Sequence, residues 1–314
     1  MRTLKISPII ESAVTAIIVT YNPDLLILSE VVDATWSQVH AIVIVDNGSS
    51  IDMAGWVASL AKDNIHVICL EANLGIAAAQ NVGIHWAQQH GSDFLLLLDQ
   101  DSTISDGMVE MLLSAFHENT CGTVAVSAVG PKFIDSITGH PADFLCISRF
   151  GIRRAPCKHG KNVVPVDFLI ASGSLISMAC LMDVGDMDCS LFIDHVDVEW
   201  IFRARAKGYH ALGHCQATMA HSIGERRIRV WFLRRRNIPF HKPFRYYYLF
   251  RNGIELSKRN YIPLSWKIYN AIRLIQFLVV MGILHPQRNT ALRMMLRGTK
   301  DGFLGKLGPL GNLC

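Results

Sequence analysis

The chain of 314 residues has few charged residues, and acidic ones are scarce towards its end. Charged residues make up 18% of the sequence and hydrophobic residues 50%, a composition that excludes a disordered or fibrous protein. Residues 203–314 contain 3 Asp and Glu against 21 Lys and Arg, whereas residues 1–202 contain 23 against 9. The net charges of −14 and +18 indicate that the back of the chain meets something anionic, either nucleic acid or phospholipid headgroups.

Paired cysteine motifs are absent as well. The 8 cysteines include no Cys-x-x-Cys pair, which argues against a zinc ribbon and a thioredoxin-like site. A chain of this length can bury enough surface to fold without disulfides or a structural metal. We therefore expect a reducing, cytoplasmic compartment.

Long hydrophobic runs are also missing. The longest uncharged apolar run covers residues 274–284, well short of the roughly 20 residues that a membrane-spanning helix needs. The first apolar run leads into Thr20-Tyr21-Asn22-Pro23 and not into a small-residue cleavage site, so it is not a signal peptide. We expect no transmembrane segment.

The first hundred residues alternate between two patterns. Short apolar runs at residues 14–20, 41–45, 66–70 and 94–98 predict strands, and helical spacing of apolar residues predicts helices over 25–37, 54–62 and 76–90. Continuously apolar strands separated by helices predict an α/β fold, Rossmann-like, with a mostly parallel sheet covered by helices on both faces. Further on, residues 163–177 read as a strand, 192–207 as a loop leading into a helix, and residues from Arg226 as amphipathic helices.

The ends of the four predicted strands are polar, and ligands of such sheets bind beyond these ends. In Asp99-Gln100-Asp101, two carboxylates follow a buried strand, where they are costly unless a cation satisfies them. A hard divalent ion that also binds phosphate oxygens would do so. The competing interpretation is a turn whose aspartates cap the next helix.

Two other strand ends allow similar pairs of interpretations. Asp46, followed by Gly48, either accepts a hydrogen bond from a pyrimidine N–H or belongs to an ordinary turn. Gly75, Ala79 and Gly83 form a stripe of small residues where a ligand or another backbone can approach, and Asn73 is placed to cap that helix.

The segment from Asp194 to Glu199 contains three carboxylates. An attacking hydroxyl must lose its proton, so a carboxylate base is expected in a group-transfer enzyme. Alternatively the segment is an acidic helix start that pairs with Arg203 and Arg205. His221 follows as either a metal ligand or a structural histidine.

Taken together and in order, these motifs resemble family 2 glycosyltransferases, which are inverting enzymes of the GT-A fold; the resemblance covers roughly residues 14–224. Finer features are similar to the bacterial rhamnosyltransferase branch, which transfers L-rhamnose from dTDP-L-rhamnose during O-antigen or lipopolysaccharide synthesis. These features are Asp99-Gln100-Asp101-Ser102, Ser172-Gly173-Ser174, the segment from Phe192 to Trp200, His221-x-x-Gly224-Glu225, Arg245-Tyr246-Tyr247 and Arg251-Asn252.

The resemblance implies roles for individual residues. By this resemblance, the metal, Mg²⁺ or Mn²⁺, is bound by Asp99, Asp101 and His221. The acceptor is bound by Gly173, Ser174, Glu199 and Trp200. The nucleotide sugar is bound by Thr20, Tyr21, Asn22, Asp46, Asn73, Gly75, Ala79, Asn81, Asp99 and Gln100. Many members have Glu-Asp where this chain has Asp194-His195, so the base is either Asp194, which the pattern slightly favours, or Asp197.

The resemblance also suggests an organisation and partners. Residues 1–225 would form the catalytic domain, and residues 226–314 basic helices lying on the cytoplasmic face of a bacterial inner membrane, near a saccharide acceptor on polyprenyl diphosphate. The alternative is that residues 274–284 pack on the catalytic domain or across a dimer, with the arginines forming only a solvated face; self-association is left open. Two alternatives stay open too: a UDP-hexose or UDP-N-acetylhexosamine donor on the same fold, and a non-enzymatic nucleic-acid-binding protein. The second lacks any legible nucleic-acid module.

Overall fold

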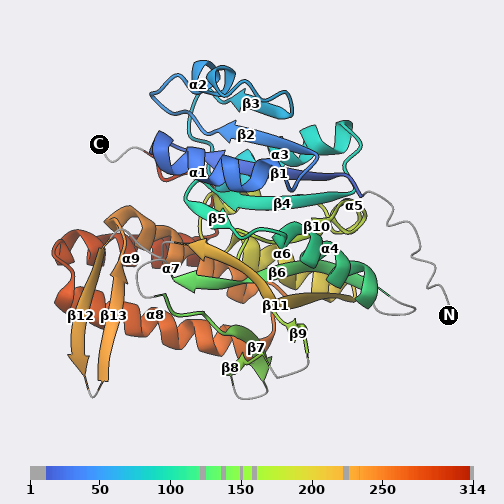
Figure 1. Ribbon diagram of the computed structural model, residues 1–314. Coiled ribbons are helices and arrows are strands. Elements are labelled where there is room, and N and C mark those ends of the chain that lie inside the picture. Colours follow the sequence, from blue (N-terminus) through green and yellow to red (C-terminus); the bar gives the residue numbers. More distant parts are fainter. Residues whose placement is uncertain are drawn as a thin grey trace.

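The computed structural model describes residues 12–120, 125–135, 139–148, 151–157, 161–221, 226–232 and 234–311 (Figure 1). For residues 221, 226–232 and 234–239 it describes the backbone alone.

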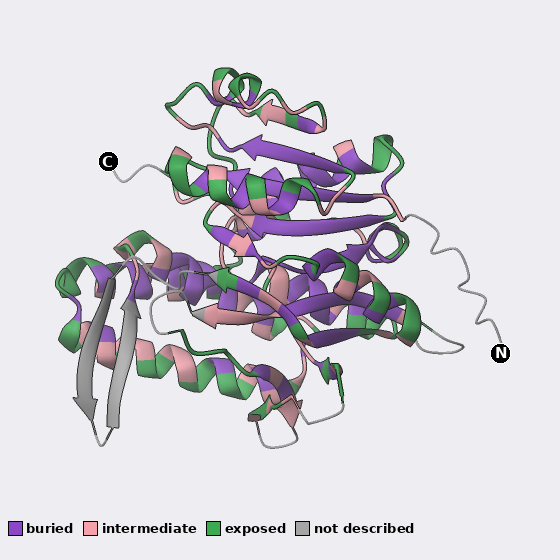
Figure 2. Cartoon of the chain, viewed as in Figure 1, coloured by how far each residue is buried: buried purple, intermediate pink, exposed green. Residues whose placement is uncertain are grey.

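The first half of the chain builds the parallel part of a central sheet. Strands β1 (Val14–Thr20), β2 (Ala41–Asp46), β3 (Ile65–Cys69) and β4 (Phe94–Asp99) lie in the order β3-β2-β1-β4. Between them run α1 (Leu25–Trp36), α2 (Met53–Ser59) and α3 (Ile76–Gln89). These seven elements agree with the sequence prediction to within three residues, because each carries its own hydrophobic period. Figure 2 shows β1, β2 and β4 buried along almost their whole length.

The second half extends this sheet in mixed directions. The short strand β10 (Leu175–Ser177) lies antiparallel between β4 and β6 (Ala125–Asp135), and β11 (Tyr209–His221) runs parallel to β6. Strands β5 (Ser102–Ile104) and β9 (Val163–Val166) pair with β11. The other elements here are α4 (Met108–Asn119), β7 (Phe144–Ser148), β8 (Gly151–Ala155), α5 (Met178–Val184), the 3₁₀ turn η1 (Cys189–Leu191) and α6 (Val196–Ala206).

The strand predicted over residues 163–177 is two strands in the structure. Residues 167–174 leave the sheet between β9 and β10 and run to the carboxyl end of β4, where the amide of Gly173 donates to the carbonyl of Leu97 at 2.7 Å. Apolar residues dominate this stretch, which is why its sequence does not mark the interruption.

The back of the chain begins with a hairpin and continues as helices. Strands β12 (Arg226–Phe232) and β13 (Arg234–Phe240) pair antiparallel, and α7 (Pro243–Lys258), α8 (Leu264–Leu284) and α9 (Arg288–Leu304) follow. The prediction of helices from Arg226 is therefore wrong as far as Phe240. β-branched Ile228 and Val230 alternate with arginines there, which is the period of a strand. The mainly helical character of the rest is confirmed.

Among the described residues, α8 is one helix long and apolar enough to cross a membrane by length and composition. The expectation of no such segment counted only the uncharged run from residue 274, whereas the helix begins at Leu264 and includes Lys267 and Arg273. A core helix can pass the same test. One face of α8 packs on α7, α9 and the β7–β8 hairpin.

Two of the cysteines are bonded to each other. Cys157, after β8, forms a disulfide with Cys215 in β11, 58 residues further along the chain. A fold without disulfides was expected from the sequence, because no local spacing of cysteines marks a pairing over that distance.

Candidate active site

The carboxyl ends of β1 and β2 form one side of the candidate site. The hydroxyl of Thr20 donates to the carboxylate of Asp46 at 2.9 Å, and the amide of Ser49 donates to the same carboxylate at 2.9 Å. Asp46 is only 3% exposed. The turn and the neighbouring strand therefore fix its oxygens at the sheet edge.

Tyr21, Asn22 and Gln100 connect this side to β4. The backbone amide of Tyr21 donates to the side-chain oxygen of Gln100 at 2.8 Å, and the Asn22 side chain accepts from the amide of Ser50 at 2.9 Å. The Tyr21 side chain is 49% exposed, so its ring is available for a flat ligand to stack on. The structure thus brings these residues together with Thr20 and Asp46, as the sequence predicted.

Asn73 and Gly75 lie at the start of α3, beside the residues 192–195 that lead into α6 and that we call the acidic loop. Asn73 does not cap the helix; its side-chain oxygen accepts from the Gly75 amide at 3.0 Å and from the Asn47 side chain at 3.2 Å. Gly75 has φ +90°, and a Cβ there would lie 2.6 Å from the carbonyl oxygen of Phe192. Only glycine fits this position. The segment therefore joins the donor side of the site to the acidic loop.

Ala79 and Asn81, predicted to line the nucleotide site, are buried in packing instead. Asn81 exchanges two hydrogen bonds of 2.9 Å with the backbone of Met187. A Cβ on Gly83 would lie 2.5 Å from a methyl group of Ile17. The stripe of small residues thus serves close contact between helix and sheet, the alternative that the sequence left open.

Asp99 and Asp101 follow β4 as predicted. The Asp99 amide donates to the hydroxyl of Ser172 at 3.0 Å, and Asp101 is exposed. Neither caps α4, whose N-cap is Gly107 without a side-chain hydrogen bond. His221 ends β11 opposite Ser102, but its side chain lies outside what the structure describes.

A metal would find suitable donors here. Carboxylate oxygens are what Mg²⁺ and Mn²⁺ prefer, and Asp99 and Asp101 offer them at the sheet edge. Within the described part of the chain, no three His, Cys, Asp or Glu side chains gather into a ready-made metal cluster. A bound ion would therefore take further oxygens from a ligand or water.

Asp194 forms a close ion pair with Arg245, which α7 brings to the acidic loop. The Arg245 Nε lies 3.0 and 3.2 Å from the two carboxylate oxygens, and its Nη2 lies 3.0 Å from one of them. Although burial acts to lower it, the pKa of Arg245 is raised by Asp194, with further contributions from Asp99 and Asp197. The guanidinium therefore contacts one carboxylate and is stabilised electrostatically by two others.

Asp197, in the first turn of α6, differs from Asp194 in its hydrogen-bond partners, which are backbone amides. Its carboxylate accepts from the amides of Val198 at 2.8 Å and Ala171 at 3.3 Å. Burial raises its pKa to about 6; these two hydrogen bonds act against the rise, and the charges of Asp194 and Asp99 add to it. A carboxylate with a pKa near neutrality can accept a proton and release it again.

Gly173 and Ser174 were predicted to bind the acceptor, but their hydrogen bonds go to the backbone of Leu97 and Ile170. The Ser174 hydroxyl donates to the carbonyl of Ile170 at 2.6 Å, and the side chain is 3% exposed. Ser172 and Ala171, which were given no role, are the residues of this segment that bond Asp99 and Asp197. The Ser172-Gly173-Ser174 motif marked the segment but not which member points to the site.

Glu199 and Trp200 are in no position to meet an acceptor, because both are 1% exposed. Glu199 pairs with Arg203 at 2.9 Å and Arg259 at 3.2 Å, and it accepts a hydrogen bond of 2.5 Å from Tyr261. The Trp200 indole donates to the carbonyl of Gly185 at 2.8 Å. The pairing with Arg203, raised as the alternative in the sequence, is correct for Glu199.

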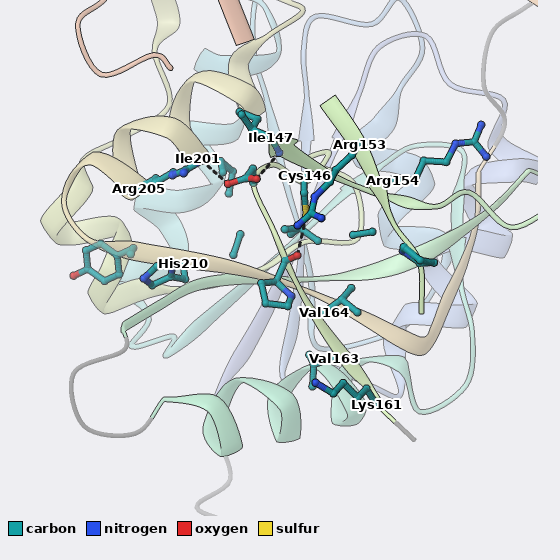
Figure 3. A pocket seen from close by; sticks show the side chains of 17 residues that line it. Cys146, Ile147, Arg153, Arg154, Lys161, Val163, Val164, Ile201, Arg205 and His210 are labelled. Atoms are coloured by element: carbon teal, nitrogen blue, oxygen red, sulfur yellow. Dashed lines mark hydrogen bonds and ion pairs between the residues drawn. The ribbon is translucent and has the colours of Figure 1, made fainter. Parts of the chain in front are cut away.

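A cavity of about 450 Å³ lies at the other end of α6, away from these carboxylates. Figure 3 shows Arg153 reaching into it and Arg154 pointing outwards. None of the site residues predicted from the sequence lines it; its cationic lining residues are Arg153, Arg154, Lys161 and Arg205.

Comparison with known proteins identifies the family. A family model described as glycosyl transferase family 2 matches residues 15–170. The dTDP-rhamnosyl transferase RfbF of Shigella flexneri is 32% identical over 302 residues, which cover 95% of this chain and 97% of that protein. The chain belongs to glycosyltransferase family 2.

More distant relatives share parts or the fold of this glycosyltransferase. A low-salt glycan biosynthesis hexosyltransferase, Agl10 of Haloferax volcanii, is 27% identical and covers 59% of each chain. The crystal structure of S. aureus TarS 1–349 has a TM-score of 0.55 at 14% identity, covering 94% of this chain and 92% of that one. GalNAc-T7, solved with UDP, GalNAc and Mn²⁺, has a TM-score of 0.57 at 14% identity, covering 88% and 58%. These structures confirm the GT-A fold.

The acidic loop of this glycosyltransferase is held by α7, through two residues that we call the loop anchor, Arg251 and Asn252. Both are fully buried. The Asn252 amide donates to the carbonyls of Leu191, Ile193 and Asp194 at 2.8–2.9 Å. Arg251 donates to the carbonyl of Leu191 at 2.8 Å. This pair was one of the features that resemble the rhamnosyltransferase branch, but no role for it could be predicted from the sequence.

Replacing Asn252 tests the loop anchor. Asn252→Leu keeps the volume similar but removes this donor from the carbonyls of Ile193 and Asp194 and leaves that of Leu191 to Arg251, so we expect the free energy of unfolding to fall by about 2–4 kcal/mol. Urea denaturation measures the loss. Asn119→Leu, which removes one amide donor from a partly buried helix end, should cost under about 1 kcal/mol. Equal urea midpoints for the two variants would show that the loop anchor contributes no more to stability than an ordinary hydrogen bond at a helix end.

Proposed function

We propose that this glycosyltransferase moves L-rhamnose from dTDP-L-rhamnose to a saccharide acceptor, with inversion at the anomeric carbon. The observation that carries the proposal is one end of the sheet where a fixed Asp46 and the Asp99-Gln100-Asp101 turn lie, with the half-buried Asp197 of α6 bonded to the neighbouring amide of Ala171. The rhamnosyl donor is supported by the similarity to the Shigella protein over nearly the whole of both chains.

The nucleotide would lie across the ends of β1 and β2. The Asp46 carboxylate is placed to accept from a thymine N–H, and the exposed Tyr21 ring offers a surface beside the base. Asn73 and Gly75 would bound the site on the third side. Asp99 and Gln100 then face the diphosphate, since Gln100 is bonded to the backbone of Tyr21.

A divalent cation, Mg²⁺ or Mn²⁺, would be held by Asp99 and Asp101, with His221 as a third ligand from the end of β11. When bound, it supplies positive charge that offsets the negative charge developing on the departing nucleotide diphosphate. The two carboxylates fit such an ion because they are adjacent hard oxygen donors. Arg245 offers a second positive charge close to Asp99.

Asp197 is the residue we propose as the base. Asp194 is engaged by Arg245 through three contacts, so a proton would have to displace an ion pair. Asp197 holds only backbone amide donors. In the transfer, Asp197 accepts the proton of the acceptor hydroxyl, and the hydroxyl oxygen bonds to the anomeric carbon. The bond from that carbon to the diphosphate breaks on the opposite face, releasing dTDP with the bonding electrons.

The acceptor is proposed to be a saccharide linked to a polyprenyl diphosphate, in the synthesis of O-antigen or a related surface polysaccharide. The nearest alternative is a UDP-hexose or UDP-N-acetylhexosamine donor, since TarS was solved with UDP-GlcNAc on the same fold. Donor choice is therefore the first property to measure.

A donor panel decides the sugar. We expect release of nucleotide diphosphate from dTDP-L-rhamnose with Mg²⁺ or Mn²⁺, and rates at least about tenfold lower from UDP-glucose, UDP-galactose and UDP-N-acetylglucosamine. Asp101→Ala should lower turnover by at least about a hundredfold, because it removes one of the two carboxylates proposed to hold the ion, and a thermal melt checks that the variant is folded. Asp106→Ala, an exposed aspartate five residues on, is the matched control. Turnover of Asp101→Ala in EDTA at the wild-type rate would contradict the metal assignment.

The pH dependence separates the two candidate bases. A base must be ionised, so we expect kcat/KM to fall as the pH drops through about 6, where burial places the pKa of Asp197. Asp197→Asn should reduce kcat by about a hundredfold or more with donor binding retained, whereas Asp194→Asn should keep the acidic limb.

The opposite pattern would make Asp194 the base: an acidic limb that survives in Asp197→Asn and disappears in Asp194→Asn. NMR of the product checks the stereochemistry independently. A retained anomeric configuration would exclude direct displacement by the acceptor hydroxyl.

A further inference from the structure

Helix α8 presents an apolar stripe to solvent. Six residues, each more than half exposed, recur every three or four positions and so lie along one face of the helix. We call them the outer stripe: Leu264, Ile268, Ile272, Ile275, Val279 and Ile283. Figure 2 shows exposed segments recurring along α8, in contrast to the buried strands of the sheet.

The opposite face of α8 is tied to the protein. Trp266, Asn270 and Met281 are buried there. The Asn270 side chain donates to the carbonyl of Gly253 in α7 at 3.0 Å. A helix anchored in this way lies along the surface of the molecule, so the outer stripe is an exposed surface and not the wall of a core. Contiguous apolar surface of this kind marks a contact site.

The surroundings of the outer stripe are cationic. Helix α8 contains Lys267 and Arg273 and no acidic residue. Helix α9, which packs on α8, carries exposed Arg288, Arg293 and Lys300.

The acidic residues of α7 and α9 do not offset this charge, because each is bonded within the fold. Glu255 pairs with Lys258 at 2.9 Å. Asp301 accepts from the Tyr247 hydroxyl at 3.0 Å and faces Arg297 at 3.8 Å. The rim of the outer stripe is thus left positive.

We propose that the outer stripe docks this protein on an anionic lipid surface. The apolar side chains enter the boundary between headgroups and acyl chains, while Lys267 of α8 and the exposed Arg288, Arg293 and Lys300 of α9 meet the headgroups. Because the inner face stays bonded to α7, the helix lies on the membrane and does not cross it.

A second copy of the chain fits the same stripe less well. A symmetric dimer through α8 would set the same cationic rim against itself, and like charges across an interface oppose association. An anionic membrane has the complementary charge. The surface deepens the proposed function, since a lipid-linked acceptor would be held at the same plane, but it rests on α8 and its neighbours and not on the donor assignment.

Vesicle flotation of the full chain tests the proposal without any sugar nucleotide. We expect binding to phosphatidylcholine vesicles that contain phosphatidylglycerol, much weaker binding to phosphatidylcholine alone, and loss of binding at high salt as the charges are screened. The double variant Ile272→Gln and Ile275→Gln should weaken binding about tenfold or more. Ile268→Gln with Val279→Gln should do the same. All four side chains are solvent-exposed, so the melting temperature should not change.

The matched control is Leu26→Gln with Met182→Gln. These residues are 80% and 64% exposed on α1 and α5, and their replacement should leave vesicle binding unchanged. The proposal is overturned if the wild-type protein ignores anionic vesicles at low salt, if neutral vesicles bind it equally well, or if both stripe variants bind like the wild type. It is also overturned if light scattering shows a dimer that the stripe variants abolish. Nucleotide release from dTDP-L-rhamnose without lipid tests the proposed function separately.

Discussion

The candidate site depends on how a loop without regular structure is kept in one shape. Phe192, Asp194 and His195 all have φ near +65°, a conformation that costs free energy for residues with side chains and persists only when the surroundings over-determine it. Three groups of contacts do so here: the loop anchor on α7, the ion pair of Arg245 with Asp194, and the close approach of Gly75 to Phe192. Two of these groups come from α7 and the third from the start of α3, so the position of the carboxylates is set by long-range packing and not by local sequence.

The difference between local sequence signals and long-range packing explains what could be predicted from the sequence. Strands β1 to β4 and their helices were placed closely because the hydrophobic period is a local signal, and Asp46 and Asp99 follow from where those strands end. The pairing of Glu199 with Arg203 was among the alternatives, but its burial could not be predicted, since Arg259 and Tyr261, which pair with it and donate to it, lie about sixty residues further along. The β12–β13 hairpin was missed because its arginines were taken as the polar face of a helix, although they alternate with β-branched residues.

The charge difference between the front and back of the chain has two physical origins. Part of it is used inside the fold: Arg245 and Arg259 from the basic back meet Asp194, Asp188 and Glu199 from the acidic front, at distances of 2.6–3.2 Å. These pairs are partly or fully buried, where a charge needs a partner. Other cations, including Arg288, Arg293 and Lys300 of α9, are exposed. The net charge of residues 203–314 does not distinguish the cations that form ion pairs inside the fold from those that are exposed. For this reason the whole basic region first suggested a single anionic partner.

The loop anchor also has a consequence for how the protein matures during synthesis. The parallel sheet and the acidic loop leave the ribosome first, yet Asn252 and Arg251 follow about sixty residues later, and Arg251 also donates to the carbonyl of Gly308. A nascent chain that stops before α7 can therefore form strands β1 to β4 while its loop carbonyls stay solvated. Catalytic competence is then acquired only after α7 and the residues as far as Gly308 have been made, so a chain that stops earlier should not act on its nucleotide sugar.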